Sequence, residues 1–390
     1  MKKTLAIVLS FVMVLALCAG MFSFAAEKGY AETEADKLWA AATTVKSTKV
    51  LITVNSVKKY ITAETAGTKL SDLFGADFAG TLAGSVAFKD GVLTLTGVKC
   101  TVDKEGVATD MQFAITSDAS LKIVLKGDKG STAYIKCQNN GDFTDEAGTK
   151  TTKTAGTHLI YTSDDGVIVK GAGNTGRSKG SIIVYGNIGF AIDCGTGYDA
   201  FIIDSNSATE AAPANLIIGN SVPSTAVGTN QAVIENRSGN IIFCDNADWT
   251  VTHTGTTTEG GKVDATGRDS AILVRKEAPA GSKVIFRDSV KIVATATVRG
   301  AVAACPQVDY TAPVADGIDV SGLAEGSTIK VNGTAATAIT GAATELKVEI
   351  TPKPVEVPPA TSDASVVAIA VVALISVAAA VVVLRKRVNG

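Results

Sequence analysis

The sequence of 390 residues has few of the residue types on which many protein chemistries depend. It contains only 2 His, 2 Trp and 6 Cys, and aromatic residues make up 5% of the chain. Two histidines leave little room for a histidine-rich metal site or for several general bases. The sparse cysteines exclude a disulfide-dense scaffold, and none of them forms a zinc-binding Cys-x-x-Cys pair.

An excess of positive charge is also missing, because 36 Lys and Arg face 38 Asp and Glu. Binding of nucleic acid needs clustered Lys and Arg against the phosphates, so we expect no nucleic-acid partner. Taking two lysines near the N-terminus and three cations near the C-terminus from the 36 basic residues leaves 31 against 38 acidic ones. This mildly acidic body disfavours acidic surfaces as partners through bulk charge alone.

The first 25 residues have the pattern of a secretory signal peptide. Lys2 and Lys3 precede an uncharged apolar run, and small residues follow it. Ser23 and Ala25 supply the small residues that signal peptidase requires, so we predict cleavage after Ala25. A cut after Ala31 and an uncleaved membrane anchor are the alternatives, and the body is exported in each case.

The other end of the chain predicts a membrane anchor. Residues 366–384 carry no charge, and at about 1.5 Å per residue they span about 28 Å, near the thickness of the bilayer core. Arg385, Lys386 and Arg387 follow, and positive charge stays on the cytoplasmic side. We therefore predict a single transmembrane helix over residues 365–384 with the body outside, the alternative being a buried core helix.

Between the body and this span lies a proline-rich spacer at residues 351–364, which favours an extended polyproline conformation. The order of Pro358-Pro359-Ala360-Thr361-Ser362, apolar span and basic tail resembles the cell-wall sorting signal of Gram-positive surface proteins. In that signal a sortase cuts after the Thr of Leu-Pro-x-Thr-Gly. Pro359 and Thr361 match the motif, whereas Pro358 replaces the Leu and Ser362 replaces the Gly. The resemblance implies sortase-like processing at Thr361, with a plain membrane anchor as the alternative.

The body consists of short β-branched runs that end at Gly, Asp or Asn, with almost no helical periodicity. A composite unit of two such runs begins at Phe190, at Ala232 and at Ala271, and so recurs about every 40 residues. A degenerate repeat of this size without helices predicts an all-β solenoid, in which each coil stacks on the next. An antiparallel β-sandwich array is the rival architecture.

The ends of a solenoid need caps, because they expose strand edges. A short helix is predicted at residues 36–42, a strand at 49–54 and a terminal pair of strands at 327–332 and 345–350. The predicted segments are a signal peptide (1–25), an N-terminal cap (26–84), a parallel β-helix (85–325), a C-terminal β segment (326–350), the spacer (351–364), the transmembrane helix (365–384) and a cytoplasmic basic tail (385–390).

Two stretches, Gly180-Ser-Ile-Ile-Val-Tyr-Gly186-Asn187-Ile188 and Ala232-Val233…Gly239-Asn240-Ile241-Ile242, carry a more specific resemblance. They are similar to the right-handed parallel β-helix proteins of Gram-positive surfaces, in particular the group described as containing a carbohydrate-binding domain. The resemblance covers about residues 91–293. It implies a right-handed parallel β-helix and an extracellular or cell-surface polysaccharide as the partner.

Candidate site residues are few. Carboxylates gather at turns, and we predict Asp245 and Asp248 as calcium ligands, because calcium takes oxygen ligands. The alternative is that they are turn residues without a metal. Trp249, Tyr185 and Tyr198 are the candidate aromatic platforms for a sugar. His158 and His253 are expected to be ordinary strand or loop residues, and the five cysteines of the body small buried residues rather than disulfides.

The expected function is that of a non-enzymatic binding or adhesion module for polysaccharide, anchored at the cell surface. A structural component of the cell envelope is one alternative. A polysaccharide lyase or hydrolase is another, for which Arg268, Arg275 and Arg287 are possible bases. Adjacent residues on a strand point to opposite faces, so these arginines form no joint site with the aspartates beside them.

Overall fold

The computed structural model describes residues 27–354, with gaps at residues 63–64, 66, 76–77, 79, 105–106, 111–112, 196–198, 206–212, 230 and 256–267, and the backbone alone for 102–104 and 107–110. The predicted signal peptide with Ala25, the spacer beyond residue 354 with Thr361, the transmembrane helix and the basic tail lie outside the described residues. The described chain up to Pro352 forms one compact unit.

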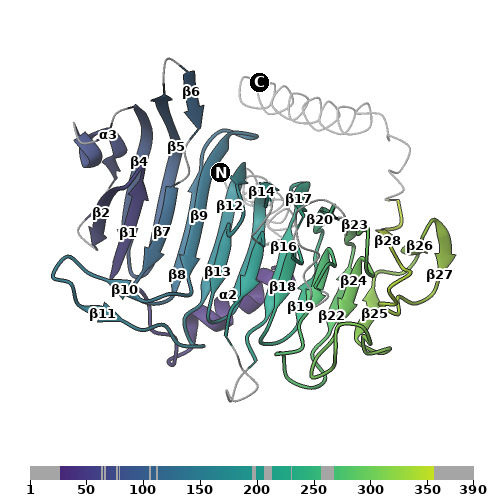
Figure 1. The fold of residues 1–390 in the computed structure, drawn as a ribbon. Coiled ribbons are helices and arrows are strands. Elements are labelled where there is room, and N and C mark those ends of the chain that lie inside the picture. Colours follow the sequence, from purple (N-terminus) through teal and green to yellow (C-terminus); the bar gives the residue numbers. More distant parts are fainter. Residues whose placement is uncertain are drawn as a thin grey trace, which may run out of the picture. The chain divides into compact units, whose positions relative to one another are not determined.

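The body of this unit is built from strands that pair in parallel with strands of the next coil (Figure 1). This large, parallel-rich sheet agrees with the predicted all-β solenoid and differs from an antiparallel sandwich. Each complete coil contributes strands to three faces. The first face holds β5 (Val92–Lys104), β8 (Leu121–Lys126), the start of β12 (Leu159–Gly171), the start of β14 (Ile182–Asp193), β16 (Leu216–Asn220), β19 (Ile241–Phe243), β22 (Val284–Asp288) and β25 (Ile318–Leu323).

The second face follows a corner in the chain and continues from β12 and β14. Its strands are the start of β9 (Thr132–Asn139), the ends of β12 and β14, β17 (Ser224–Gly228), β20 (Asp248–His253) and β23 (Lys291–Thr295). The third face holds β7 (Phe113–Ser117), the end of β9, β13 (Gly176–Ser178), β15 (Phe201–Ile203), β18 (Ile234–Asn236), β21 (Ile272–Val274) and β24 (Val302–Ala304).

The core consists of ladders of like side chains. On the first face, register places apolar side chains of successive coils directly above one another: Leu159, Ile182, Leu216, Ile241 and Val284. All are fully buried. Because neighbouring strands lie about 4.8 Å apart, each side chain contacts the one above and the one below. This explains why β-branched and aliphatic residues recur at the same place in every coil.

Buried asparagines hold the corners between the faces. Asn220 donates from Nδ2 to the carbonyl of Ile188 at 2.9 Å and to Ser224 Oγ at 2.9 Å, and its Oδ1 accepts from Trp249 Nε1 at 2.8 Å. Asn139 and Asn236 occupy other corners and bind turn carbonyls in the same way. Each amide satisfies backbone groups that a corner would otherwise leave buried without partners.

Both ends of the coil stack are capped by antiparallel strands. At the N-terminal end, β1 (Lys49–Val54) pairs with β7 and with β2 (Val57–Thr62), and β3 (Thr68–Lys69), α3 (Leu70–Phe74), β4 (Thr81–Lys89) and β6 (Val107–Asp110) complete the cap. At the other end, β28 (Lys347–Thr351) pairs with β23 and with β26 (Thr328–Val331), which also pairs with β27 (Thr334–Ala336). The predicted strand at 49–54 and the predicted terminal strand pair are confirmed.

The cysteines behave as small buried residues. Cys137, Cys194, Cys244 and Cys305 are buried free thiols, and Cys100 is buried as well. Burial raises the pKa of Cys137 and of Cys305 to about 12, so these thiols stay protonated at neutral pH and are poor nucleophiles. The expectation that these cysteines are small buried residues is confirmed. They do not form one row, because Cys244 lies in the cluster under α2 and Cys305 in a separate cluster.

The described part of the chain has two helices, α2 (Tyr30–Ala40) and the short α3. Neither has the length and apolar composition that a membrane-spanning helix requires. The sequence predicted the first helix at residues 36–42, whereas it starts at Tyr30, because its N-terminus is held by a residue far away in the sequence.

A buried lysine lies beside the small hairpin of β10 (Phe143–Thr144) and β11 (Lys150–Thr151). Lys153 is 6% exposed, and its Nζ lies 5.5 Å from the centre of the Phe143 ring. Among the described residues this nitrogen has no hydrogen-bond partner. Burial lowers the pKa of Lys153 to about 8, so folding favours the neutral amine.

We predict that Lys153 makes the protein more stable as pH rises. Its folded-state pKa of about 8 lies below the unfolded value of 10.5, so the cost of burying the charge disappears between these two pH values. The difference in unfolding free energy between Lys153→Met and the wild type should shrink by on the order of 3 kcal/mol from pH 7 to pH 10.5. Urea unfolding of both proteins across this pH range measures the two unfolding free energies. A difference between them that does not change with pH would contradict the prediction.

Candidate binding site

The candidate site lies where two successive turns leave the first face. Asp245 follows β19, and Asp288 ends β22 in the next coil. Both residues have a positive φ, 57° and 60°, a left-handed conformation that Asp adopts more readily than most residues. The backbone N–H of Asp245 donates to Asp288 Oδ2 at 3.1 Å. The stacking of coils therefore brings two carboxylates that are 43 residues apart to one corner.

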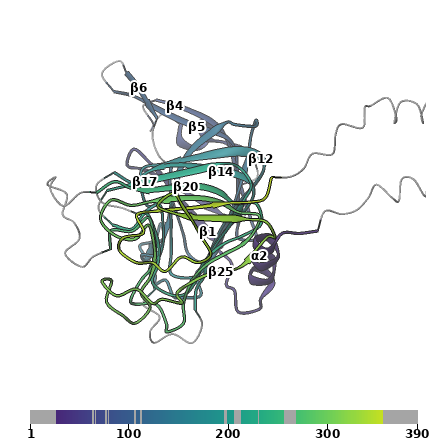
Figure 2. The same ribbon diagram turned by 90° about the vertical axis from the view of Figure 1, so that its right-hand side faces the viewer.

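Helix α2 covers the outside of the first face next to this corner (Figure 2). Ala31 and Ala35 of the helix pack on a row of isoleucines that point outward from successive coils. These are Ile160, Ile183, Ile217 and Ile242. Gly219 permits the close approach, because a Cβ at this position would lie 2.5 Å from the Cβ of Ala31. The helix buries an apolar outer row that solvent would otherwise contact.

Asp245 caps the N-terminus of α2 from 215 residues away. Its Oδ1 accepts from the backbone N–H of Tyr30 at 2.6 Å, and its Oδ2 accepts from that of Ala31 at 3.1 Å. The residue before the helix, Gly29, has no side chain for this task. Since the first N–H groups of a helix lack partners and carry partial positive charge, a carboxylate there is favourable both as an acceptor and as an anion.

An open groove of about 650 Å³ lies between the first turns of α2 and the two stacked corners. Its lining mixes charged and polar side chains with one aromatic ring, and includes Tyr30, Lys37, Asn246 and Arg287. The guanidinium of Arg287 lies over the ring of Tyr30, 4.1 Å from its centre, and its Nε donates to Asp288 Oδ2 at 3.1 Å. Burial raises the pKa of the Tyr30 hydroxyl, so this hydroxyl stays neutral at physiological pH.

Of the two predicted calcium ligands, only Asp245 lies in this groove. Asp248 lies on the second face, where its Oδ2 is 3.1 Å from Lys291 Nζ. Both carboxylates thus already contact protein donors. No group of three or more His, Cys, Asp or Glu side chains within the described residues has the arrangement of a metal site.

The two predicted aromatic platforms that the structure describes are both buried. Trp249 is fully buried and stacks on Phe190 with ring centres 5.6 Å apart, so its expected exposure is wrong. The register of β20 turns it inward to fill the core beside Asn220. Tyr185 is 9% exposed and belongs to the cluster under α2, with Lys122 Nζ over its ring at 5.3 Å. Tyr198 lies outside the described residues.

Two of the three arginines named as possible catalytic bases, Arg275 and Arg287, have separate surroundings. Arg275 is 6% exposed, and its Nη1 donates to the buried Glu235 Oε1 at 2.7 Å. Its Nη2 lies 3.0 Å from Glu277 Oε1. In the same region of the third face, burial raises the pKa of Asp199 well above its usual range, with the nearby Glu235 as the second cause. Arg275 therefore neutralises buried carboxylates rather than facing solvent, and Arg287 is the arginine that lines the groove.

The two histidines are structural. His158 Nδ1 accepts from the backbone N–H of Ser181 at 3.0 Å, and burial lowers the pKa of His158 and of His253 to about 4. Both are thus neutral at physiological pH, in agreement with the expectation that they are ordinary strand or loop residues.

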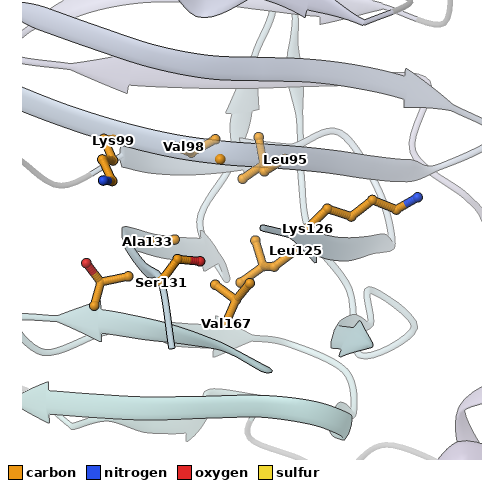
Figure 3. Close-up of a pocket in the computed structure, with 10 residues that line it drawn as sticks. Leu95, Val98, Lys99, Leu125, Lys126, Ser131, Ala133 and Val167 are labelled. Atoms are coloured by element: carbon orange, nitrogen blue, oxygen red, sulfur yellow. The ribbon is translucent and has the colours of Figure 1, made fainter. Parts of the chain in front are cut away.

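A second cavity, between β5 and the start of β9, is too small for an organic ligand. Leu95, Val98, Leu125, Ala133 and Val167 approach one another around it (Figure 3). Its volume of about 20 Å³ holds roughly one water molecule. The groove beside α2 is therefore the better candidate for a binding site.

Comparisons with protein-family models, with curated proteins and with solved structures found no match to this chain. The interpretation of the groove therefore rests on its own geometry.

We predict that Asp245→Ala loosens α2. Loss of the two hydrogen bonds to Tyr30 and Ala31 should cost about 1 kcal/mol of stability, as for other helix caps, and should speed amide exchange across the first turn of the helix. Asp248→Ala is the matched control, because its ion pair with Lys291 is at the surface and contributes at most about 1 kcal/mol. Hydrogen exchange followed by mass spectrometry measures the exchange of α2 in both variants. Unchanged exchange of α2 in Asp245→Ala would contradict the assignment of Asp245 as the cap of this helix.

Proposed function

We propose that the protein is a non-enzymatic, surface-anchored module that binds polysaccharide in the groove beside α2, on a right-handed parallel β-helix. The observation that carries the proposal is the groove itself. It is open, and it combines one aromatic ring with several hydrogen-bonding groups. Sites for small polar ligands have this combination of size, apolar surface and a few fixed polar groups.

The chemistry of the groove suits sugars. A sugar presents hydroxyl groups that both donate and accept, and the groove offers carboxylate acceptors at Asp245 and Asp288, donors at Lys37 and Arg287, and the amide of Asn246. Coil stacking fixes the two aspartates, and docking on the isoleucine row fixes α2. Little conformational entropy is lost when such a preorganised site binds a ligand.

A non-enzymatic role is favoured over a lyase or hydrolase. The groove contains no histidine or cysteine, and the histidines and cysteines that the structure describes are half to fully buried in the coil stack. Arg287 is held by Tyr30 and Asp288, and an arginine so placed keeps its proton. These contacts are suited to binding a ligand rather than to removing a proton from it.

The capped ends favour a binding module over a stalk that grows by end-to-end stacking. Strands β28 and β26 turn across the final coil, and β1 and β2 close the first one. Such antiparallel strands cover part of the edges through which a solenoid would otherwise add a further copy: those of the second face beyond β23 and of the third face before β7.

The position of α2 bears on export. Cleavage after Ala25 leaves the whole helix, whereas a cut after Ala31 removes both N–H groups that Asp245 holds. We therefore propose cleavage after Ala25. Anchoring by the helix at residues 365–384, with sortase-like processing at Thr361 or without it, is proposed from the sequence alone, and so is a place on the outer cell surface.

The test is retention of the exported full-length protein, in detergent, on a panel of immobilised neutral and acidic polysaccharides. We expect saturable retention on at least one polymer without release of shorter products. Chelator should leave retention unchanged if Asp245 only caps α2, and should abolish it if calcium holds the ligand. Retention on none of the polymers would contradict the proposed function, and release of oligosaccharides would favour an enzyme.

A further inference from the structure

Arg287 is held in a fixed position, and two nitrogens of its guanidinium have no hydrogen-bond acceptor among the described residues. The Tyr30 ring supports one face of the group at 4.1 Å, and Nε donates to Asp288 at 3.1 Å. The side chain is 36% exposed, and its Nη1 and Nη2 have no protein partner among the described residues. Two N–H-bearing nitrogens in one plane are thus presented beside the groove.

Three carboxylates near Arg287 already accept hydrogen bonds, one of them from Arg287 itself. The two N–H groups at the start of α2 hold Asp245. Asp288 accepts from the Asp245 N–H and from Arg287 Nε. Glu34 Oε1 accepts from Lys37 Nζ at 2.8 Å. Among the described residues, Nη1 and Nη2 of Arg287 remain without an acceptor, whereas Lys28 Nζ contacts Glu32 and Asp36 and Lys37 Nζ contacts Glu34. The lining as a whole holds four carboxylates and three cations, so the case for a bound anion depends on Arg287.

The geometry of a guanidinium selects among anions. Its two parallel N–H groups match the two oxygens of a carboxylate, which makes the pair stronger and more directional than one with a lysine. Stacking on Tyr30 lowers the entropy lost when the pair forms. The mildly acidic balance of the whole body repels polyanions in general, so recognition of an acidic polymer here depends on this local contact.

We propose that the groove binds the uronic acid units of an acidic polysaccharide, with the sugar carboxylate against Nη1 and Nη2 of Arg287 and hydroxyl groups against Asn246 and Asp288. This inference rests on the proposed function and narrows it to one class of polysaccharide. It also makes Arg287 the residue that determines specificity at the site.

The test compares an acidic polymer with its methyl ester, which differs only at the carboxylate, and with a neutral polymer. Full-length protein in detergent is titrated with polygalacturonate, with its methyl ester and with a neutral galactan. We expect the acid form to bind about tenfold or more tightly than the ester, as one charge-assisted hydrogen-bonded pair provides. Lowering the pH below the pKa of the sugar carboxyl group should remove the difference in affinity between the acid and its ester.

Two substitutions at Arg287 separate its fork geometry from its charge. Arg287→Lys keeps the charge but loses the two parallel N–H groups, so it should lose most of the preference for the acid over the ester. Arg287→Met should bind the acid and the ester equally well. Lys291→Met removes an exposed cation on the second face and should change nothing. Hydrogen exchange of α2 in each variant shows whether the helix remains docked.

Each other outcome has one meaning. Equal binding of acid, ester and neutral polymers overturns the uronate proposal and leaves the polysaccharide function standing. Absence of binding to all of them overturns both. Binding of poly-glutamate as tight as that of polygalacturonate overturns the assignment to a sugar, and full preference in Arg287→Met overturns the role of Arg287.

Discussion

The structure depends on one constraint, the register in which each coil lies on the next. A parallel ladder about 4.8 Å apart brings together residues that are some tens of positions apart in sequence. This produces the aliphatic row from Leu159 to Val284 inside the first face and the isoleucine row outside it. A shift of one residue would turn both rows to the wrong side. Buried asparagines such as Asn220 maintain this register, because their amides bind the corners.

The groove is a consequence of the same register. Phe243 lies opposite Phe286, so the turns after them stack, and Asp245 comes to lie beside Asp288. The outward isoleucine row gives α2 an apolar surface, and Gly219 lets the helix approach closely. Asp245 then fixes the start of the helix, and Tyr30 supports Arg287. Each group in the groove is positioned by a contact over a long sequence distance, which suits a rigid receptor more than a mobile one.

The sequence predicted the parts that depend on local pattern. Short β-branched runs between glycines indicated an all-β solenoid, and the strand at residues 49–54 matches β1. The parts that depend on tertiary contacts were not predicted. The start of α2 was missed, because its cap comes from Asp245. Trp249 was expected at the surface because it follows Asp248, yet the strand turns alternate residues inward and fills the core with the ring. Tyr30 was not considered, although it lies just after the predicted cleavage site.

The surroundings of the two aspartates predicted as calcium ligands also depend on tertiary contacts. Asp245 and Asp248 are close in sequence, but one serves the corner beside α2 and the other pairs with Lys291 on the second face. Two residues that are close in sequence within one coil can serve different faces. Residues at equivalent positions of successive coils lie side by side. Asp288, 43 residues away, is therefore the carboxylate that contacts the Asp245 turn.

The central claim is that the polysaccharide lies in the groove beside α2, and a hydrogen-exchange footprint of the full-length protein with and without a retained polymer tests it most directly. The account predicts slower exchange at residues 27–37, 245–246 and 287–289, with no change along the outer side of β17 and β20. Protection confined to another face, with these three segments unchanged, would contradict it.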